Sequence, residues 1–165
     1  MRHMTKRHVF YSFHYDNDVM RVQQIRNIGV LEAQPLMYIN NWEEIKRGGN
    51  RAIQNWIDTN MEGKSCLVVL VGEKTAGREW VNYEIKHAWD KRMGVLGIYI
   101  HNIKCLRTGI SRQGDNPFRG FTINNTTPMD SLVKCYNPDP YNAYNDIACN
   151  LESWVEKAIQ IRSRY

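Results

Sequence analysis

Two long apolar runs mark the centre of a predicted β-sheet. They span residues 66–71 (Cys-Leu-Val-Val-Leu-Val) and residues 94–100, and neither alternates with polar positions. A run that is apolar at every position is typical of a strand buried on both faces, as central strands of parallel sheets are. Shorter segments rich in aromatic and aliphatic residues predict three further strands, the last of them at an edge: residues 6–13, 35–39 and 131–136.

Apolar residues at helical spacing predict four helices between the strands. The helix after the central strand places Val81, Ile85 and Ala88 on one stripe. It also carries Trp80 and Glu84 beside this stripe. The stripes of the other three helices are Val19, Val22 and Ile25; Ala52, Ile53, Trp56 and Ile57; and Ile147, Leu151, Trp154, Val155, Ala158 and Ile159.

Polar residues ahead of two of these helices predict where the helices begin. Asp16 or Asn17 is expected to cap the first helix with a side-chain oxygen. Asp139 is expected to cap the last helix, with Pro140 at its first position. The alternation of strands and helices predicts a three-layer α/β sandwich with a five-stranded parallel sheet of the flavodoxin-like kind, in a single domain over residues 6–165.

The composition fits one ordinary domain and gives no support to a nucleic-acid surface. The 165 residues are 42% hydrophobic, which is enough for one core. The formal net charge is +5, from 22 Lys and Arg against 17 Asp and Glu, but the basic residues form no run of five or more. A nucleic-acid footprint requires clustered cations, so no nucleic-acid partner is expected, and an anionic small molecule suits this balance equally well.

The sequence carries no sign of a membrane span, and its four cysteines favour a reduced, cytoplasmic protein. No stretch of eighteen apolar residues occurs, and the N-terminus lacks the layout of a signal peptide. Asp16, Asp18 and His14 are close enough in sequence to gather a metal ion. Capping and solvent exposure explain such residues more often, so no metal site is expected.

Several common α/β chemistries lack their motifs. The turn over residues 12–18 contains no glycine, which excludes a GxGxxG fingerprint, a P-loop and a flavodoxin-type phosphate cradle after the first strand. A phospho-acceptor receiver would need an aspartate after the central strand, where the sequence is Gly72-Glu73. A serine nucleophile would need a GxSxG elbow, which is missing.

Three motifs, taken in order, resemble the TIR and TIR-like family over nearly the whole chain. They are the turn Ser12-Phe13-His14-Tyr15-Asp16-x-Asp18, the strand end Val71-Gly72-Glu73-Lys74-Thr75, and Trp80-x-x-x-Glu84 at the start of the next helix. More closely, residues 9–18, the helix that carries Trp80, and residues 97–102 resemble the short stand-alone TIR-like proteins of the bacterial Thoeris anti-phage system. Residues 40–50 depart from the pattern, because they show no recognisable family loop motif.

The resemblance implies a TIR-like domain that consumes NAD by cleaving its nicotinamide–ribose bond, as an NAD glycohydrolase or ADP-ribosyl cyclase does. In this family a Trp-x-x-x-Glu helix holds the catalytic glutamate, which here is Glu84. NAD would be the substrate, and no separate cofactor is expected. The residues expected around the substrate are Ser12, Phe13, His14, Asp16 and Trp80.

The same resemblance implies a signalling role. Attack by water would give ADP-ribose, whereas attack by a hydroxyl of the substrate would give a cyclic ADP-ribose-type messenger in anti-phage defence. The implied partners are a phage-derived trigger and an NAD- or cyclic-nucleotide-sensing effector protein downstream, and a homo-oligomer is compatible with this role.

One carboxylate is sufficient for this bond cleavage. The nicotinamide ring leaves as a neutral molecule and needs no general acid, so the carboxylate only has to stabilise positive charge on the ribose. Two alternatives remain at this point. Glu84 could be a solvated helix residue paired with Arg78 or Lys91, as ordinary helix glutamates are. The whole chain could also be a non-enzymatic TIR-like module that binds a protein or a nucleotide.

Overall fold

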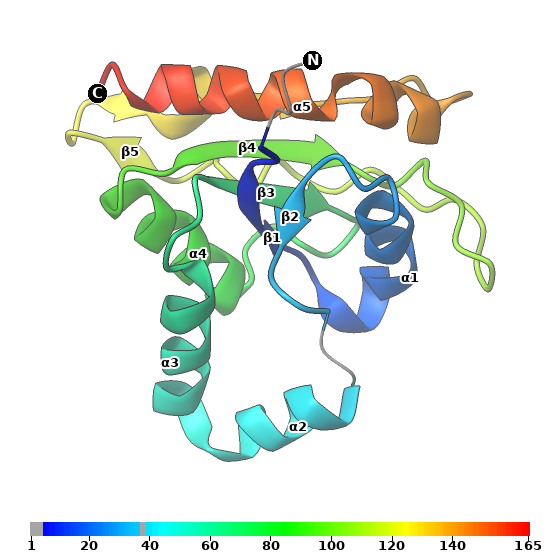
Figure 1. Cartoon of the computed structure of the whole chain (residues 1–165), viewed down its shortest axis with the longest axis horizontal. Coiled ribbons are helices and arrows are strands. Elements are labelled where there is room, and N and C mark those ends of the chain that lie inside the picture. The colour runs from blue at the N-terminus through cyan, green and yellow to red at the C-terminus, as the bar shows by residue number, and fades with distance from the viewer. Residues whose placement is uncertain (1–4, 37–38) are drawn as a thin grey trace.

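A five-stranded parallel sheet forms the centre of the computed structural model, which describes residues 5–36 and 39–165 (Figure 1). The strand order is β2-β1-β3-β4-β7, and every neighbouring pair is parallel. This arrangement confirms the predicted α/β fold with a five-stranded parallel sheet. The strands are β1 (His8–Ser12), β2 (Glu32–Ala33), β3 (Cys66–Val71), β4 (Gly94–Tyr99) and β7 (Cys135–Tyr136).

Helices cover both faces of this sheet and complete the three layers. One face carries α1 and α5, and the other carries α3 and α4, while α2 lies farthest from the sheet (Figure 1). The helices are α1 (Tyr15–Arg26), α2 (Ile39–Arg47), α3 (Gly49–Met61), α4 (Glu79–Asp90) and α5 (Ala143–Arg162). The connection from β4 to β7 adds a small antiparallel pair, β5 (Thr122–Ile123) and β6 (Thr127–Pro128), and the 3-10 turn η1 (Met129–Ser131).

Strand β3 lies at the centre of the sheet and is completely buried. All six of its side chains are 0% exposed, because alternate residues enter two different hydrophobic cores. Cys66, Val68 and Leu70 join the core under α1 and α5. The residues between them join the core under α3 and α4. Each large apolar side chain buried in this way contributes about 1.5–3 kcal/mol, and this double burial explains why the run shows no polar alternation.

The second strand lies earlier in the chain than the sequence predicts. Residues 35–39 were expected to form it, but β2 is Glu32–Ala33, and α2 begins at Ile39. Residues 37–38 lie outside the described ranges. The missed helix α2 occupies most of the segment over residues 40–50 that lacked a family loop motif. The prediction of a strand was wrong because a short apolar segment fits a strand or a helix start equally well.

The predicted helix starts and the predicted last strand also need correction. Neither Asp16 nor Asn17 caps α1, because the cap position is His14 and no side chain bonds there. Asp139 does not cap α5, which begins at Ala143; instead, its carboxylate accepts a bond from the Tyr141 backbone N–H in the preceding turn. The edge strand predicted over residues 131–136 forms only at its end, as β7.

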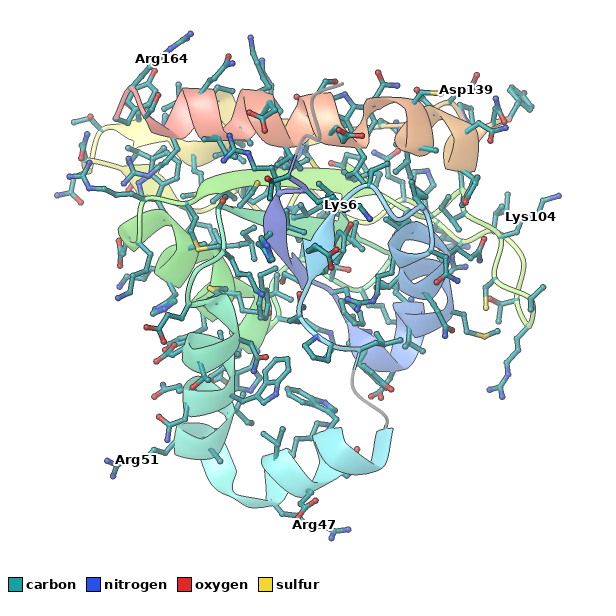
Figure 2. All side chains as sticks on the ribbon, viewed as in Figure 1. Lys6, Arg47, Arg51, Lys104, Asp139 and Arg164 are labelled. Carbon is teal, nitrogen blue, oxygen red and sulfur yellow. The ribbon has the colours of Figure 1, made fainter. Side chains whose placement is uncertain are left out.

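Charged side chains lie mostly at the periphery, as Arg47, Lys104 and Arg164 illustrate (Figure 2). Within the two described ranges, none of the helices combines the length and hydropathy that a membrane crossing requires.

Helix α5 approaches β4 closely at Gly94. A Cβ atom built on Gly94 would lie 2.7 Å from the backbone nitrogen of Ile159 and 2.9 Å from the carbonyl carbon of Ala158. Both atoms belong to helix backbone, so they cannot rotate away as a side chain would. The absence of a side chain at Gly94 therefore sets how deeply α5 packs onto the sheet.

We expect Gly94→Ala to lower the free energy of unfolding by about 1–3 kcal/mol, because the added methyl group forces α5 away from β4. Urea unfolding followed by circular dichroism measures this loss. Gln160→Ala, at an exposed position of the same helix, is the control and should change stability by less than about 0.5 kcal/mol. A Gly94→Ala protein as stable as the control would contradict the close contact.

Candidate active site

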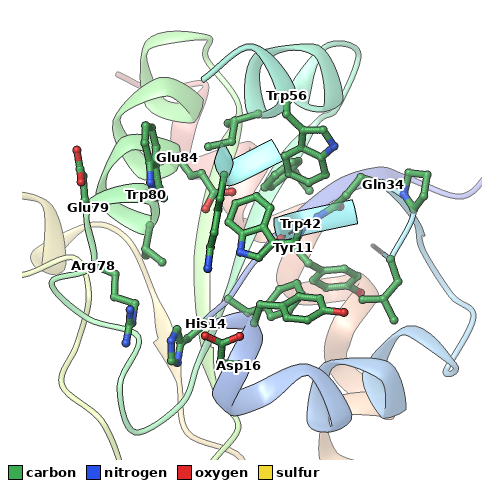
Figure 3. Close-up of a pocket in the computed structure, with 18 of the residues that line it drawn as sticks. Tyr11, His14, Asp16, Gln34, Trp42, Trp56, Arg78, Glu79, Trp80 and Glu84 are labelled. Carbon is green, nitrogen blue, oxygen red and sulfur yellow. Dashed lines mark hydrogen bonds between the residues drawn. The ribbon is translucent and has the colours of Figure 1, made fainter. Parts of the chain in front are cut away.

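A cavity of about 310 Å³ opens at the carboxyl edge of the sheet (Figure 3). Its walls come from the end of β1, the start of α1, the segment after β2, helices α2 and α3, and the first turns of α4. The strand order reverses between β1 and β3, since β2 lies on one side of β1 and β3 on the other. Ligands of open α/β sheets bind at such a reversal, outside the carboxyl ends of the strands.

Glu84 is the buried carboxyl group of this cavity. It lies on α4 one turn after Trp80, and Val81, Ile85 and Ala88 on the same helix are buried in the core. Packing of this stripe brings Glu84 inward until the residue is only 7% exposed. Its carboxyl group points into the cavity near Trp80 (Figure 3). The alternative that Glu84 is a solvated helix residue paired with Arg78 or Lys91 is therefore ruled out.

A hydrogen bond joins Glu84 to the first strand. The Ser12 hydroxyl, at the end of β1, donates to Glu84 Oε1 at 3.1 Å, and Ser12 is itself 1% exposed. Burial raises the pKa of Glu84 to about 8, although the bond from Ser12 acts in the opposite direction. The carboxyl group is consequently mostly protonated at neutral pH while the cavity is empty.

His14 and Asp16 lie at the side of the cavity where α1 begins. The Nδ1 atom of His14 is buried and has no hydrogen-bond partner among the described residues. Burial lowers the pKa of His14, the positive charge of Arg78 lowers it further, and Asp16 opposes both effects. Figure 3 shows the Arg78 guanidinium group and the His14 ring close together. Asp16 is exposed and remains open to solvent.

Aromatic rings make up much of the cavity wall. Trp42, Trp56 and Trp80 approach it from three different helices, α2, α3 and α4. Trp42 meets Trp56 edge to face, with their ring centroids 6.0 Å apart. Phe13 stacks on Tyr15 at 6.1 Å near the start of α1. Flat apolar surfaces of this kind suit planar heterocycles such as nucleotide bases.

The side chain of Gln34 ties the segment after β2 to β1. The Tyr11 N–H donates to Gln34 Oε1 at 3.0 Å, and Gln34 Nε2 donates to the Tyr11 carbonyl oxygen at 2.8 Å. The amide thereby takes the place that a further residue of β2 would fill beside β1. Arg26 holds the same segment by donating to the Gln34 carbonyl oxygen at 2.7 Å.

The structure brings the predicted site residues together. Phe13, His14, Asp16, Trp80 and Glu84 line the cavity, and Ser12 reaches it through its bond to Glu84. Their roles in binding and catalysis stay predictions. Sequence reasoning missed Trp42, Lys46 and Trp56, which also line the cavity. The apolar stripe of residues 52–57 included Trp56 as a core residue, and a helical pattern for residues 39–47 would have found the other two.

Asp18 is separate from this cavity. It is 0% exposed, and Arg21 Nη1 donates to its Oδ1 at 3.2 Å. Arg21 also donates to the carbonyl oxygens of Ile103 and Gly109, so the ion pair fastens α1 to the loop after β4. Asp18 thus serves as a partner for Arg21, and no group of three or more metal-binding side chains forms within residues 5–36 and 39–165.

Two comparisons with known proteins found matches to this chain. A family model described as "Thoeris protein ThsB, TIR-like domain" matches residues 10–104, a range that includes both Ser12 and Glu84. A protein of Bacillus cereus (strain MSX-D12), named "Putative cyclic ADP-D-ribose synthase ThsB1", is 34% identical over 120 residues. That match covers 70% of this chain and 62% of the relative, so it spans less than two thirds of the relative's length.

We expect the buried carboxyl group to reduce stability as the pH rises. Glu84 keeps its proton up to about pH 8 in the folded protein but loses it near pH 4.5 in the unfolded chain. Between these values the unfolded state binds fewer protons, so the wild type should lose on the order of 1 kcal/mol per pH unit relative to Glu84→Gln, with no further relative loss above pH 8.

Urea unfolding at a series of pH values measures this difference. Glu152→Gln, at an exposed position of α5, is the control and should follow the wild type throughout. If the stability of Glu84→Gln runs parallel to that of the wild type from pH 4.5 to 8, the carboxyl group is not held in its neutral form.

Proposed function

The chain belongs to the Thoeris ThsB TIR-like family, and on this premise we propose that it consumes NAD by cleaving the nicotinamide–ribose bond, with Glu84 as the essential carboxylate. The observation that carries the proposal is the Glu84 carboxyl group, buried in an aromatic cavity and bonded to Ser12. The name of the Bacillus cereus relative, a cyclic ADP-D-ribose synthase, supports NAD as the substrate class.

The proposed reaction breaks the bond between the ribose C1′ atom and the ring nitrogen of nicotinamide. The electron pair of that bond stays with the nitrogen, so the pyridinium ring becomes neutral nicotinamide and leaves without a proton. Positive charge then develops on the ribose, and the ionised Glu84 carboxylate stabilises it. The aromatic side chains, Trp80 among them, supply flat surfaces against which the nicotinamide ring can be held.

The protonation of Glu84 links substrate binding to this chemistry. In the empty cavity, burial raises the pKa of Glu84 to about 8 and keeps most of the population neutral. The nicotinamide ring of NAD is positively charged, and an opposite charge nearby favours the ionised carboxylate. NAD binding below pH 8 therefore releases a proton, and the Ser12 hydroxyl remains in place to donate to the carboxylate that forms.

The identity of the acceptor determines the product. Water yields ADP-ribose, and a hydroxyl of the same substrate yields a cyclised ADP-ribose; in both cases the proton of the acceptor passes to solvent. The name of the relative favours the cyclised product. Such a product would serve as the messenger to a separate NAD- or cyclic-nucleotide-sensing effector, after a phage-derived trigger starts its synthesis.

A second function is favoured by the neutral state of Glu84. A protonated carboxyl group in an apolar cavity can donate a hydrogen bond to a ligand without any chemistry. The chain would then be a non-enzymatic TIR-like module that binds a nucleotide or a protein at the same edge. Binding of NAD without release of nicotinamide would identify this alternative.

We expect Glu84→Gln to reduce nicotinamide release from NAD by at least a hundredfold, because the amide cannot carry the negative charge that opposes the ribose cation. Nicotinamide release is measured for the purified protein alone and after addition of filtered lysate from phage-infected cells. Glu152→Gln, on α5, which contributes no residue to the cavity lining, makes the same chemical change at an exposed position and should keep the wild-type rate.

Equal rates for the wild type and Glu84→Gln would remove Glu84 from the mechanism. If neither protein releases nicotinamide with or without the lysate, the enzymatic proposal fails and the binding module is favoured.

The pH dependence offers an independent test. If the ionised form of Glu84 is active, kcat/KM for NAD should rise about tenfold per pH unit below pH 8 and level off above it, since kcat/KM reports the free enzyme. Ser12→Ala removes the hydrogen bond that lowers the pKa of Glu84, so its profile should move to higher pH. A profile that is flat between pH 6 and 9 would contradict this assignment.

A further inference from the structure

Cationic side chains gather at one side of the cavity, around His14. Lys46 on α2 and Arg78 at the start of α4 both line the cavity, so they face it from two different walls. Their positive charges, with that of Lys74 in the β3–α4 loop, lower the pKa of His14 beyond the effect of burial. The field at His14 is therefore positive even though Asp16 lies beside it.

Neither Lys46 nor Arg78 is neutralised by a strong ion pair. The Arg78 Nε–H donates to the carbonyl oxygen of Lys74 at 3.0 Å, and no salt bridge to Arg78 occurs among the described residues. Lys46 meets Glu43 at 3.5 Å, with side chains 40% and 50% exposed, and pairs of this kind contribute little. The Lys46 ammonium group also lies 5.8 Å from the ring centroid of Trp42, on the cavity side of α2.

The first turn of α4 adds to the attraction for anions. Arg78 is the N-cap residue of this 12-residue helix, and among the described residues no side chain caps the N–H groups that follow it, although the first turn also carries the carboxylate of Glu79. Helix N-termini carry a partial positive charge and bind phosphate groups readily. The guanidinium group of an arginine at this position can form paired hydrogen bonds with two phosphate oxygens, whereas a lysine acts as a single point charge.

The spacing along α4 relates these cations to Glu84. Arg78 and Glu84 are six residues apart, which corresponds to roughly 9 Å of helix. A dinucleotide whose ribose is held at the Glu84 carboxyl group could therefore reach Arg78 with its diphosphate, and Lys46 lines the same cavity from α2. A diphosphate carries the two negative charges that two separate cations can balance.

We propose that Lys46 and Arg78 form a diphosphate clamp that binds the two phosphate groups of the dinucleotide while Glu84 faces the ribose. This inference rests on the proposed function for the location of the ribose. The clamp gives the site selectivity for dinucleotides over nucleosides, and it places the specificity for phosphate on α2 and on the N-terminus of α4, apart from the reacting bond.

ADP-ribose is the probe that tests the clamp, because it carries the diphosphate and lacks the nicotinamide–ribose bond. Its binding is measured by the fluorescence of the cavity tryptophans or by calorimetry, at low salt and at 0.5 M NaCl. Lys46→Gln and Arg78→Gln should each weaken ADP-ribose binding about tenfold, which is the usual effect of losing one charge-assisted hydrogen bond. High salt should weaken binding to the wild type more than to either variant.

Arg47→Gln is the matched control for charge. Arg47 follows Lys46 on α2, is exposed, and points away from the molecule (Figure 2). This variant loses the same charge outside the cavity, so its affinity for ADP-ribose should stay within twofold of the wild type. Inorganic diphosphate should compete with ADP-ribose for the wild type but not for a variant that combines Lys46→Gln and Arg78→Gln. Adenosine, which has no phosphate group, should bind the wild type and all variants equally weakly.

Unchanged ADP-ribose affinity in both clamp variants would overturn the proposal, as would a loss in Arg47→Gln equal to theirs, or an absence of ADP-ribose binding to the wild type. Thermal unfolding of each variant checks that the fold persists, and Arg78→Lys should recover part of the affinity. The binding test is independent of NAD turnover. The clamp variants can lose ADP-ribose binding even if Glu84→Gln leaves NAD turnover unchanged. Conversely, they can keep ADP-ribose binding even if Glu84→Gln abolishes turnover.

Discussion

The desolvation of a single carboxyl group governs the chemistry of this cavity. Glu84 is drawn inward because its neighbours on α4 pack into the core, and there the Ser12 hydroxyl is the group that bonds to it. The hydrogen bond joins an element near the N-terminus to one in the middle of the chain, 72 residues later. Burial disfavours the charged form, so most of the carboxyl groups keep their proton below about pH 8.

The sheet makes this arrangement rigid. Strand β3 pairs with β1 on one side and with β4 on the other, and its side chains fill the cores on both faces. The end of β1 and the start of α4 are therefore fixed relative to each other by the most buried part of the molecule. The remaining wall of the cavity, formed by α2 and α3, carries Trp42, Trp56 and Lys46.

The sequence predicts those parts of the fold in which pattern and burial coincide. The apolar run at β3 and the stripe of α4 are predicted directly, because every position of the run, and every position of the stripe, is buried in one of the two cores. Trp80 and Glu84 were expected at the substrate from the resemblance to the TIR family, because the pattern alone also allowed Glu84 to be a solvated helix residue. Helix α2 could not be read in this way, because Trp42 and Ile45 pack beside another helix at the margin of the core and their apolar signal is short. Strand β2 has only two residues, and beyond it the side chain of Gln34, not its backbone, pairs with β1.

That completion of β2 by Gln34 affects how the molecule meets its neighbours in solution. Because β2 has only two residues, its backbone does not reach the N–H and C=O groups of Tyr11 on β1. Backbone groups left unpaired at the edge of a sheet act as a template for strands from other molecules. The Gln34 amide occupies both groups at once. At this point of β1, the Tyr11 backbone groups are therefore withheld from pairing with a strand of another molecule.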